Sequence, residues 1–287
     1  LLCDQNYQLA ELAALRERGV KVIGRFVWEH FTAEHIPEAR AAYDTIYSIT
    51  EAEQQRYAKM GLETPRVPWG IHPELLTFAP DNDPENPRAR EEIQAASEER
   101  PVRFVFPGGF IGHRKPLEPV VEAFNQVKNP NIRLLVKAQV ERDRLDGLSR
   151  RVRRDKRIEL HLADEEWATH LRTIAACDVC ITPSRWEGLG LPLYEAIAFC
   201  QPVITNDDPP MNEVIRDGKN GLLVPSEPDG TARSGIPARR PDVDAMAAAI
   251  EKLADPDRRR ELTEGAMRAR TKLSWDRTVN ALGRLIG

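Results

Sequence analysis

Two glutamates and the glycines between them, at positions 187–195, carry the clearest chemical signal in the sequence. Glu187 opens the run Glu-Gly-Leu-Gly, and Glu195 follows about one turn into an expected helix that has Pro192 near its start. A glycine-rich turn before a helix directs backbone N–H groups toward a ligand, and the helix N-terminus adds about half a positive charge, which favours phosphate. Carboxylates accept hydrogen bonds from sugar hydroxyls. The stretch therefore predicts a site for a phosphorylated sugar, or for a nucleotide with its ribose.

The same stretch also has a simpler interpretation, a tight turn in which the glycines allow a positive φ and both glutamates are solvated. It is not a dinucleotide fingerprint, because Leu193 stands where the third glycine would be. A bare Gly-x-Gly favours the simple turn, so the residues around it decide whether a ligand site is predicted.

A second glycine pair, Gly108 and Gly109, follows an expected strand, and Lys115 stands just ahead of the next expected helix. A ligand of an open α/β sheet binds at the carboxyl ends of the strands. A phosphate is expected to lie there, close to Lys115.

Three other patterns suggest chemistry only weakly. Cys177 and Cys180 have the spacing of a metal or redox pair, but no second cysteine pair or nearby histidine completes a zinc site. Asp242 and Asp244 stand at an expected helix start, where acidic residues are favoured without any metal. The basic run at 150–157 indicates a solvated helix face, or a contact for anionic lipid or a phosphorylated acceptor. We predict no metal site.

The elements that position these residues alternate between strands and helices, which predicts a parallel sheet with crossover helices. Thr50 and Glu53 have the spacing of a capping box at one helix start. Residues 79–100 are rich in proline and polar residues and predict a solvated connection, with one helix over 87–97, while 226–241 predicts a loop. The expected strands are 20–27, 45–49, 102–106, 132–138, 158–162, 178–182 and 202–205, and the expected helices are 8–19, 50–60, 116–127, 166–176, 191–199 and two that begin near 255 and 274.

Composition limits the classes of function. The 287 residues suggest about two domains, and 41% hydrophobic with 30% charged residues excludes a disordered chain. A net charge of -4 argues against nucleic acid as the main ligand. Four cysteines do not make a disulfide framework, so a reducing cytoplasm is expected. No apolar run approaches the roughly 20 residues that span a bilayer.

The stretch from Pro183 to Ala196, followed by Gln-Pro-Val-Ile-Thr at 201–205, closely resembles the donor-binding signature of glycosyltransferase family 4. Members of that family are retaining enzymes of the GT-B fold, and their Glu-x7-Glu motif matches Glu187 and Glu195 in spacing and surroundings. Other segments that resemble the family are 108–109 with Lys115, 122–124, 213–215 and 217–224.

The resemblance implies a role for each matching residue. Glu195 would bind the ribose hydroxyls, and Glu187 would bind hydroxyls of the donor sugar. The backbone N–H groups of Gly188, Leu189 and Gly190 would face the sugar and the diphosphate.

On the other side of the diphosphate, the resemblance implies that Lys115 neutralises the leaving group beside Gly108 and Gly109. The family often carries an arginine five or six residues before that lysine, where this chain has Gly109 and Phe110. Arg114 is the predicted substitute for this second cation.

The implied fold is α/β of the GT-B type, with two Rossmann-like domains that face each other across a cleft. The N-terminal domain would be residues 1–78 and incomplete, 79–100 the inter-domain connection, and 101–287 the nucleotide-sugar-binding domain. Because the chain starts late, we expect it to bind a nucleotide or nucleotide-sugar but to transfer sugar poorly or not at all. A catalytic histidine of the family belongs to the N-terminal domain. Trp28 or Glu29 lies closest to its expected place, with His30 just after, and Glu29 or His30 is expected to act in its place.

The predicted function is transfer of a hexose from a nucleotide-sugar to an acceptor hydroxyl with retention, without a cofactor or metal, in polysaccharide or glycoconjugate synthesis. The acceptor would be a sugar, a lipid-linked molecule or a small molecule. A cytoplasmic location is expected, with a weak peripheral contact at the inner membrane face. Two alternatives stay open: a nucleotide-sugar epimerase of the same architecture, and a donor-binding fragment without transfer activity.

Overall fold

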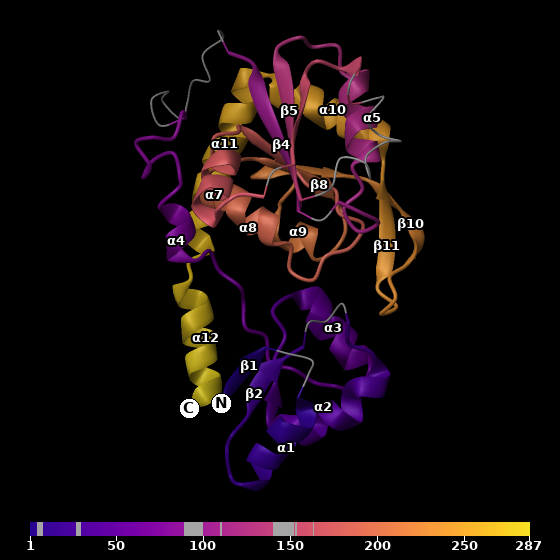
Figure 1. The fold of residues 1–287 in the computed structure, drawn as a ribbon, viewed down its shortest axis with the longest axis vertical. Coiled ribbons are helices and arrows are strands. Elements are labelled where there is room, and N and C mark those ends of the chain that lie inside the picture. Colours follow the sequence, from indigo (N-terminus) through magenta and orange to yellow (C-terminus); the bar gives the residue numbers. More distant parts are fainter. Residues whose placement is uncertain are drawn as a thin grey trace.

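The computed structural model describes residues 1–4, 8–26, 30–88, 100–109, 111–139, 152, 154–162 and 164–287. The chain forms two lobes, each built around a parallel sheet with helices packed on it (Figure 1). The lower, N-terminal lobe holds a three-stranded sheet in the order β1-β2-β3, and the upper, C-terminal lobe holds a six-stranded sheet in the order β6-β5-β4-β7-β8-β9.

The N-terminal lobe buries an aromatic core under its short sheet. Phe26, Phe31 and Tyr57 are among its fully buried side chains, and the ring centroids of Phe26 and Phe31 lie 4.4 Å apart. The elements of this lobe are β1 (Leu2–Asp4), α1 (Leu9–Glu17), β2 (Ile23–Arg25), the 3-10 turn η2 (Ala33–His35), α2 (Ile36–Ala42), β3 (Thr45–Ile46) and α3 (Glu51–Lys59).

The C-terminal lobe has a hydrophobic core on each face of its sheet, because successive residues of a strand point to opposite faces. On β4, Phe104 and Phe106 pack with the cluster that includes α5 and α10, whereas Val105 packs with the cluster that includes α7 and α8. The elements are β4 (Val102–Gly109), α5 (Glu118–Gln126), β5 (Ile132–Ala138), β6 (Ile158–His161), α7 (Trp167–Ala175), β7 (Val179–Ile181), α8 (Leu191–Ala198), β8 (Val203–Asn206), α9 (Met211–Val214), β9 (Gly221–Val224), β10 (Ser226–Thr231), β11 (Pro237–Pro241), α10 (Val243–Ala254) and α11 (Pro256–Lys272).

The chain crosses between the lobes twice. The first crossing leads through Trp69 to the short helix α4 (Pro73–Leu76), and the second leads to α12 (Asp276–Ile286). We expected 101–287 to form one domain, but α12 returns to the N-terminal lobe, where Ala281 packs with Ile23 and Tyr47 (Figure 1). Lys21 Nζ donates to the carbonyl of Leu285 at 2.9 Å, so a cation lies at the negative end of α12.

The described start of the connection, residues 80–88, is fixed to the C-terminal lobe through several buried polar residues, where the sequence predicted a solvated segment. Arg88 is buried and donates to the carbonyls of Ala175 and Phe199 at the ends of α7 and α8, at 3.3 and 2.8 Å. Asn86 Oδ1 accepts from the Arg88 amide at 2.9 Å and so turns the backbone inward. Asn86 and Arg88 are therefore buried against the lobe, whereas Asp81, Asn82 and Glu85 are exposed as expected. The helix expected over 87–97 lies almost entirely outside the described residues.

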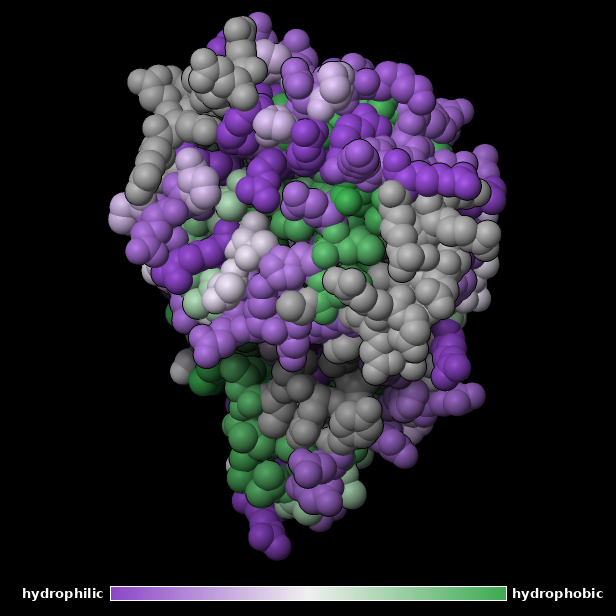
Figure 2. Space-filling model, turned by 45° about the horizontal axis from the view of Figure 1, so that its top comes forward, coloured by the Kyte–Doolittle hydropathy of each residue, from purple (hydrophilic) through white to green (hydrophobic). Residues whose placement is uncertain are grey.

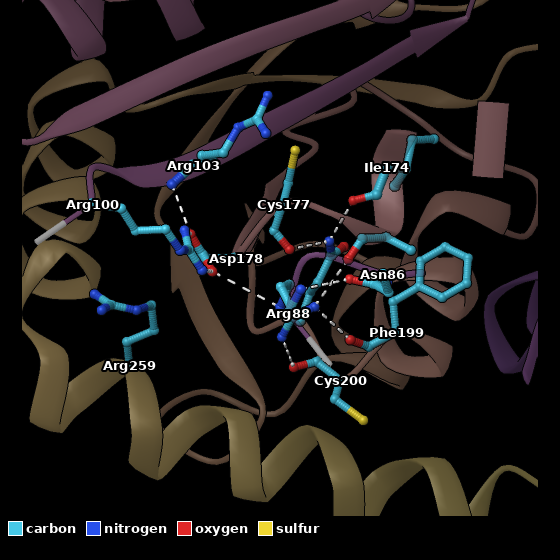
Figure 3. A network of polar contacts seen from close by, with 12 residues as sticks. Asn86, Arg88, Arg100, Arg103, Ile174, Cys177, Asp178, Phe199, Cys200 and Arg259 are labelled. Carbon is cyan, nitrogen blue, oxygen red and sulfur yellow. Dashed lines mark hydrogen bonds and ion pairs between the residues drawn. The ribbon is translucent and has the colours of Figure 1, made fainter. Parts of the chain in front are cut away.

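A buried ionic network holds the ends of this connection to the sheet (Figure 3). Arg100 donates from both terminal nitrogens to Asp178 at 2.8 Å, and Arg88 Nε lies 3.8 Å from the same carboxylate. The Arg103 amide also donates to Asp178, at 2.8 Å. Asp178 immediately precedes β7, so this network lies at the end of the sheet opposite to the carboxyl ends of the strands.

Residues 226–241 form an antiparallel hairpin rather than the expected loop. β10 and β11 pair with Ser226 opposite Pro241, and the Arg239 amide also donates to the carbonyl of Arg185 at 2.9 Å. The hairpin has few apolar residues and lacks the alternation of apolar and polar side chains that is typical of a half-buried strand. Contacts with the rest of the lobe stabilise it instead.

The face shown in Figure 2 is mostly hydrophilic over the C-terminal lobe, whereas hydrophobic side chains gather on the lower part of the molecule. None of the helices in the described part of the chain is long and apolar enough to cross a membrane.

Candidate functional site

Two loops meet at the carboxyl ends of the adjacent strands β4 and β7. The strands are parallel, with Phe104 opposite Val179, so the loop after each strand emerges at the same edge of the sheet. The amide of Arg185 donates to the carbonyl of Arg114 at 2.8 Å and joins the two loops directly.

Gly190 shapes the turn that leads into α8. Its φ is +79°, it is the N-cap of α8, and Pro192 stands in the first helical turn as predicted. The backbone angle favours glycine, and a Cβ on Gly190 would lie 2.8 Å from Leu193 Cδ1, so that a side chain here would also have to displace Leu193. The turn therefore places the N–H groups of residues 188–190 at the positive end of the helix.

Glu187 lies at the centre of the site and is buried, with 5% of its surface exposed. Its carboxylate accepts from Ser184 Oγ at 2.7 Å and from Arg114 Nη1 at 2.6 Å. The simpler interpretation of a solvated glutamate is therefore wrong for this residue. A buried carboxylate needs such partners, and the pairing fixes the direction in which it points.

Lys115 is buried between the end of β4 and Glu187. Its Nζ donates to the carbonyl of Pro107 at 3.5 Å and lies 3.9 Å from Glu187 Oε1. Both contacts are long, so an anionic oxygen brought closer to the ammonium would interact with it more strongly. Gly109, with a φ of +52°, turns the chain just beyond this point.

Glu195 lies on α8 with a half-buried side chain. Burial raises the pKa of its carboxyl above the usual value, and the charge of Lys115 offsets part of this increase. A carboxylate in such surroundings gains from hydroxyl donors, which ribose would supply. Lys115 is thus the cation that influences both glutamates.

Arg185 is a residue of this site that the sequence interpretation did not single out. It is buried, and its guanidinium donates to Asp229 Oδ2 at 2.7 Å in the β10–β11 hairpin and also contacts His113. Arg185 therefore ties the first loop, the glycine turn and the hairpin together. Its place between Ser184 and Trp186, inside the strongest motif, was the signal that could have identified it.

Two proposed catalytic positions lack support from the geometry. Glu29 lies outside the described residues, as does Phe110. His30 is exposed at the start of a turn in the N-terminal lobe. Both catalytic assignments stay predictions.

The weaker patterns have structural explanations. Cys177 and Cys180 are buried free thiols, and burial raises the pKa of Cys177 to about 12. Asp242 is the N-cap of α10 and accepts from the Ala245 amide at 2.9 Å. Among the residues that the structure describes, no group of three His, Cys, Asp or Glu side chains is arranged to hold a metal ion.

Only part of the basic run at 150–157 belongs to the described chain. There, Arg157 pairs with Asp155 at 2.6 Å and donates to the carbonyls of Val127 and Asn129. Arg157 therefore stabilises the lobe and does not belong to a solvated face.

The arrangement as a whole offers a helix N-terminus, two cations and two carboxylates around one turn. The model of the family described as Glycosyl transferases group 1 matches residues 88–268, more than half of the chain. The chain belongs to this family. The group 1 match includes both loops of the site and all of its charged residues.

Individual relatives cover a smaller part of the chain. The D-inositol 3-phosphate glycosyltransferase of Acidothermus cellulolyticus is 36% identical over 107 residues, which is 37% of this chain and 21% of that protein. The GtfA subunit of the UDP-N-acetylglucosamine–peptide N-acetylglucosaminyltransferase of Streptococcus pneumoniae is 28% identical over 174 residues, 53% of this chain and 34% of that protein. The matched parts thus span about a fifth to a third of these relatives.

Solved structures match almost the whole chain. Sucrose-phosphate synthase from Thermosynechococcus elongatus has a TM-score of 0.69 at 22% identity and covers 99% of this chain and 72% of its own. HepE from Anabaena, solved with UDP and glucose, has a TM-score of 0.71 at 16% identity, with 99% and 77% covered. At these identities the similarity shows the fold, and the predicted GT-B fold is confirmed.

Proposed function

We propose that this group 1 glycosyltransferase is a retaining, hexosyltransferase-like enzyme of family 4 that moves a sugar from a nucleotide-sugar to an acceptor hydroxyl. The observation that carries the proposal is the convergence of Lys115, Arg114, Glu187 and Glu195 on the turn before α8. A nucleotide-sugar has hydroxyls on its ribose and on its sugar, and two phosphates between them. The two glutamates would accept hydrogen bonds from the hydroxyls, and the two cations would bind the phosphates.

The donor would lie along the carboxyl edge of β4 and β7. Glu195 accepts hydrogen bonds from the ribose hydroxyls, and Glu187 from hydroxyls of the transferred sugar. The N–H groups of Gly188, Leu189 and Gly190 face the sugar and the diphosphate at the positive end of α8.

Charge stabilisation in this proposal comes from side chains and needs no bound metal. Lys115 and Arg114 stand where negative charge develops on the leaving diphosphate, close to Gly108 and Gly109. Cations held in place before the reaction lower the barrier because they need no reorganisation when the charge appears.

The proposed step breaks the bond between the anomeric carbon and the diphosphate oxygen and forms a bond from the acceptor oxygen on the same face. The acceptor proton passes to an oxygen of the departing diphosphate. The protein orients the two reactants and stabilises the leaving charge. The acceptor, the role of Glu29 or His30 and a cytoplasmic location are further parts of the proposal that need their own tests.

A panel of nucleotide-sugars, tested by calorimetry and by a transfer assay on the same preparation, tests the proposal. UDP-glucose is a sensible first donor because HepE has been solved with it. We expect the protein to bind one class of nucleotide and to transfer sugar in the presence of EDTA. The bond at the anomeric carbon of the product should have the same configuration, axial or equatorial, as in the donor. Inversion at the anomeric carbon, loss of transfer with EDTA, or epimerisation of the donor alone would each contradict it.

A further inference from the structure

The N-terminus of α3 is bound by a carboxylate from the other lobe. Glu213, on α9, accepts from the backbone amides of Glu51 and Ala52 at 2.7 and 2.8 Å. These are the first two residues of α3. The two lobes are therefore joined by a bidentate contact between a side chain and a helix end.

The remaining amide of this helical turn is satisfied within the N-terminal lobe. Thr50 Oγ1 accepts from the Glu53 amide at 3.1 Å, as a capping box predicts. The Glu53 carboxylate accepts from the Ile49 amide at 2.7 Å. Glu213 thus supplies a cap that the lobe's own residues leave open.

The last turn of α3 also contacts the C-terminal lobe. Arg56 donates to the carbonyl of Ser234, in the tip of the β10–β11 hairpin. Trp186 of the glycine turn packs against the core cluster of the N-terminal lobe, which includes Tyr57 of α3 and Ile236 of the hairpin. α3 therefore lies on the face turned toward α9 and the hairpin, and is held at both ends (Figure 1).

The Glu213 contact also lines a cavity between the two lobes. A cavity of about 670 Å³ lies between the lobes, lined by Glu51 and Ala52 on one side and by Glu213 and Tyr194 on the other. Tyr194 directly precedes Glu195 on α8. A movement of the N-terminal lobe away from this position would separate Glu213 from α3 and open this cavity.

We propose that Glu213 is a positioning residue for sugar transfer, which holds the N-terminal lobe against the donor-binding lobe by capping α3. The inference rests on the proposed function, since it assigns the lobe arrangement a part in that reaction. A carboxylate that accepts two N–H bonds at a helix N-terminus forms a strong, charge-assisted contact. Because Glu213 binds backbone groups, the contact depends on the distance between the lobes and not on the side chains of α3.

Amide hydrogen exchange, transfer kinetics and nucleotide binding in Glu213→Ala and Glu213→Gln test the inference, with Glu251→Gln as the matched control. Glu251 is exposed on α10, so its substitution removes the same charge away from the interface. We expect exchange at the amides of Glu51 and Ala52 to accelerate about tenfold or more in Glu213→Ala, from the loss of charged hydrogen bonds. The amide of Glu53, capped by Thr50, serves as an internal reference and should be unchanged.

The same variants should lower kcat for transfer about tenfold while the nucleotide Kd changes by less than about twofold, since Glu213 lies outside the proposed donor contacts. Unchanged exchange at both amides, or an equal loss of nucleotide affinity and kcat, would overturn the inference. The exchange measurement needs no turnover. If the wild-type protein transfers no sugar, the proposed function fails while exchange still decides whether the contact exists, and the positioning role falls with the function.

Discussion

Arg114 Nη1 lies 2.6 Å from Glu187 Oε2, so the cation predicted for the leaving diphosphate is bonded to the carboxylate predicted for the sugar. The two residues come from different loops, one after β4 and one after β7. Their ion pair links the part of the site that is proposed to bind phosphate to the part that is proposed to bind sugar hydroxyls. A donor that binds here adds its own anionic oxygens beside this pair and beside Lys115.

The ammonium of Lys115 should matter more for the diphosphate than for the rest of the nucleotide. Lys115→Ala should weaken binding of a nucleoside diphosphate by about 1.5–3 kcal/mol, the range for hydrogen bonds to charged groups, and leave nucleoside binding almost unchanged. Calorimetry with both ligands measures the difference. Lys252→Ala, an exposed lysine on α10, is the control. Equal losses for the two ligands would make Lys115 a structural residue.

Glu195 should show a pH-dependent signature. Burial raises the pKa of its carboxyl, so the ionised form destabilises the ligand-free fold, and this penalty appears as the pH rises above the usual carboxyl range. Glu195→Gln should therefore be more stable than wild type at neutral pH, and the difference should vanish as the pH falls and the wild-type carboxyl becomes protonated. Urea unfolding at pH 7 and below the usual carboxyl pKa measures this.

The Glu195→Gln variant, although more stable without ligand, should bind nucleotide more weakly than the wild type. Ribose hydroxyls stabilise the ionised carboxylate, so binding to the wild type should release protons, and Glu195→Gln should lose about 1.5–3 kcal/mol of binding free energy. Calorimetry in two buffers of different ionisation enthalpy detects the protons. Full affinity in the folded variant would remove Glu195 from the ribose site.

Local patterns were sufficient to predict most of the C-terminal lobe. The apolar run at 132–138 is β5 as predicted, and Asp255 caps α11 by accepting from the Arg258 amide at 2.8 Å. Such elements are specified by neighbouring residues, through strand-forming side chains or an N-cap with a following proline. The turn before α8 was predictable for the same reason.

Features that depend on distant partners could not be predicted. Arg88 belongs to a polar stretch whose burial is explained only by the carbonyl groups at the ends of α7 and α8. The return of α12 to the N-terminal lobe and the contact of Glu213 with α3 likewise depend on residues far apart in the sequence. Side chains in such contacts look like solvated polar residues until the partner is known.

The turn before α8 should not tolerate a side chain at Gly190. Gly190→Ala forces an L-residue to a φ of +79° and brings its Cβ within 2.8 Å of Leu193 Cδ1. Gly230→Ala is a matched control, because Gly230 has the same φ of +79° but no atom within 4 Å of the place where a Cβ would lie. Both variants should lose about 1–2 kcal/mol of stability from the left-handed backbone. Only Gly190→Ala should also weaken nucleotide binding, and equal behaviour in both assays would contradict this account of the turn.

The Asp178 network should be a major source of stability far from the site. Burial alone would raise the pKa of Asp178, but the hydrogen bonds and charges of Arg100 and Arg88 outweigh it and hold the pKa below its usual value. A carboxyl whose pKa is lowered in the folded state contributes stability that is present above its unfolded pKa and is lost as the pH falls through its folded pKa.

Asp178→Asn should therefore destabilise the protein at pH 7 by about 3–5 kcal/mol, the cost of leaving buried cations without their partner. The difference from wild type should begin to shrink below about pH 4 and should vanish only below the lowered pKa of the folded carboxyl, where the wild-type carboxylate also becomes protonated. Because Asp178 lies at the opposite end of the sheet from Glu187, nucleotide affinity of the folded variant should be unchanged. Urea unfolding at both pH values, with calorimetry at pH 7, tests the three expectations, and a stability difference that does not depend on pH would show that the charge of Asp178 is not what holds the network together.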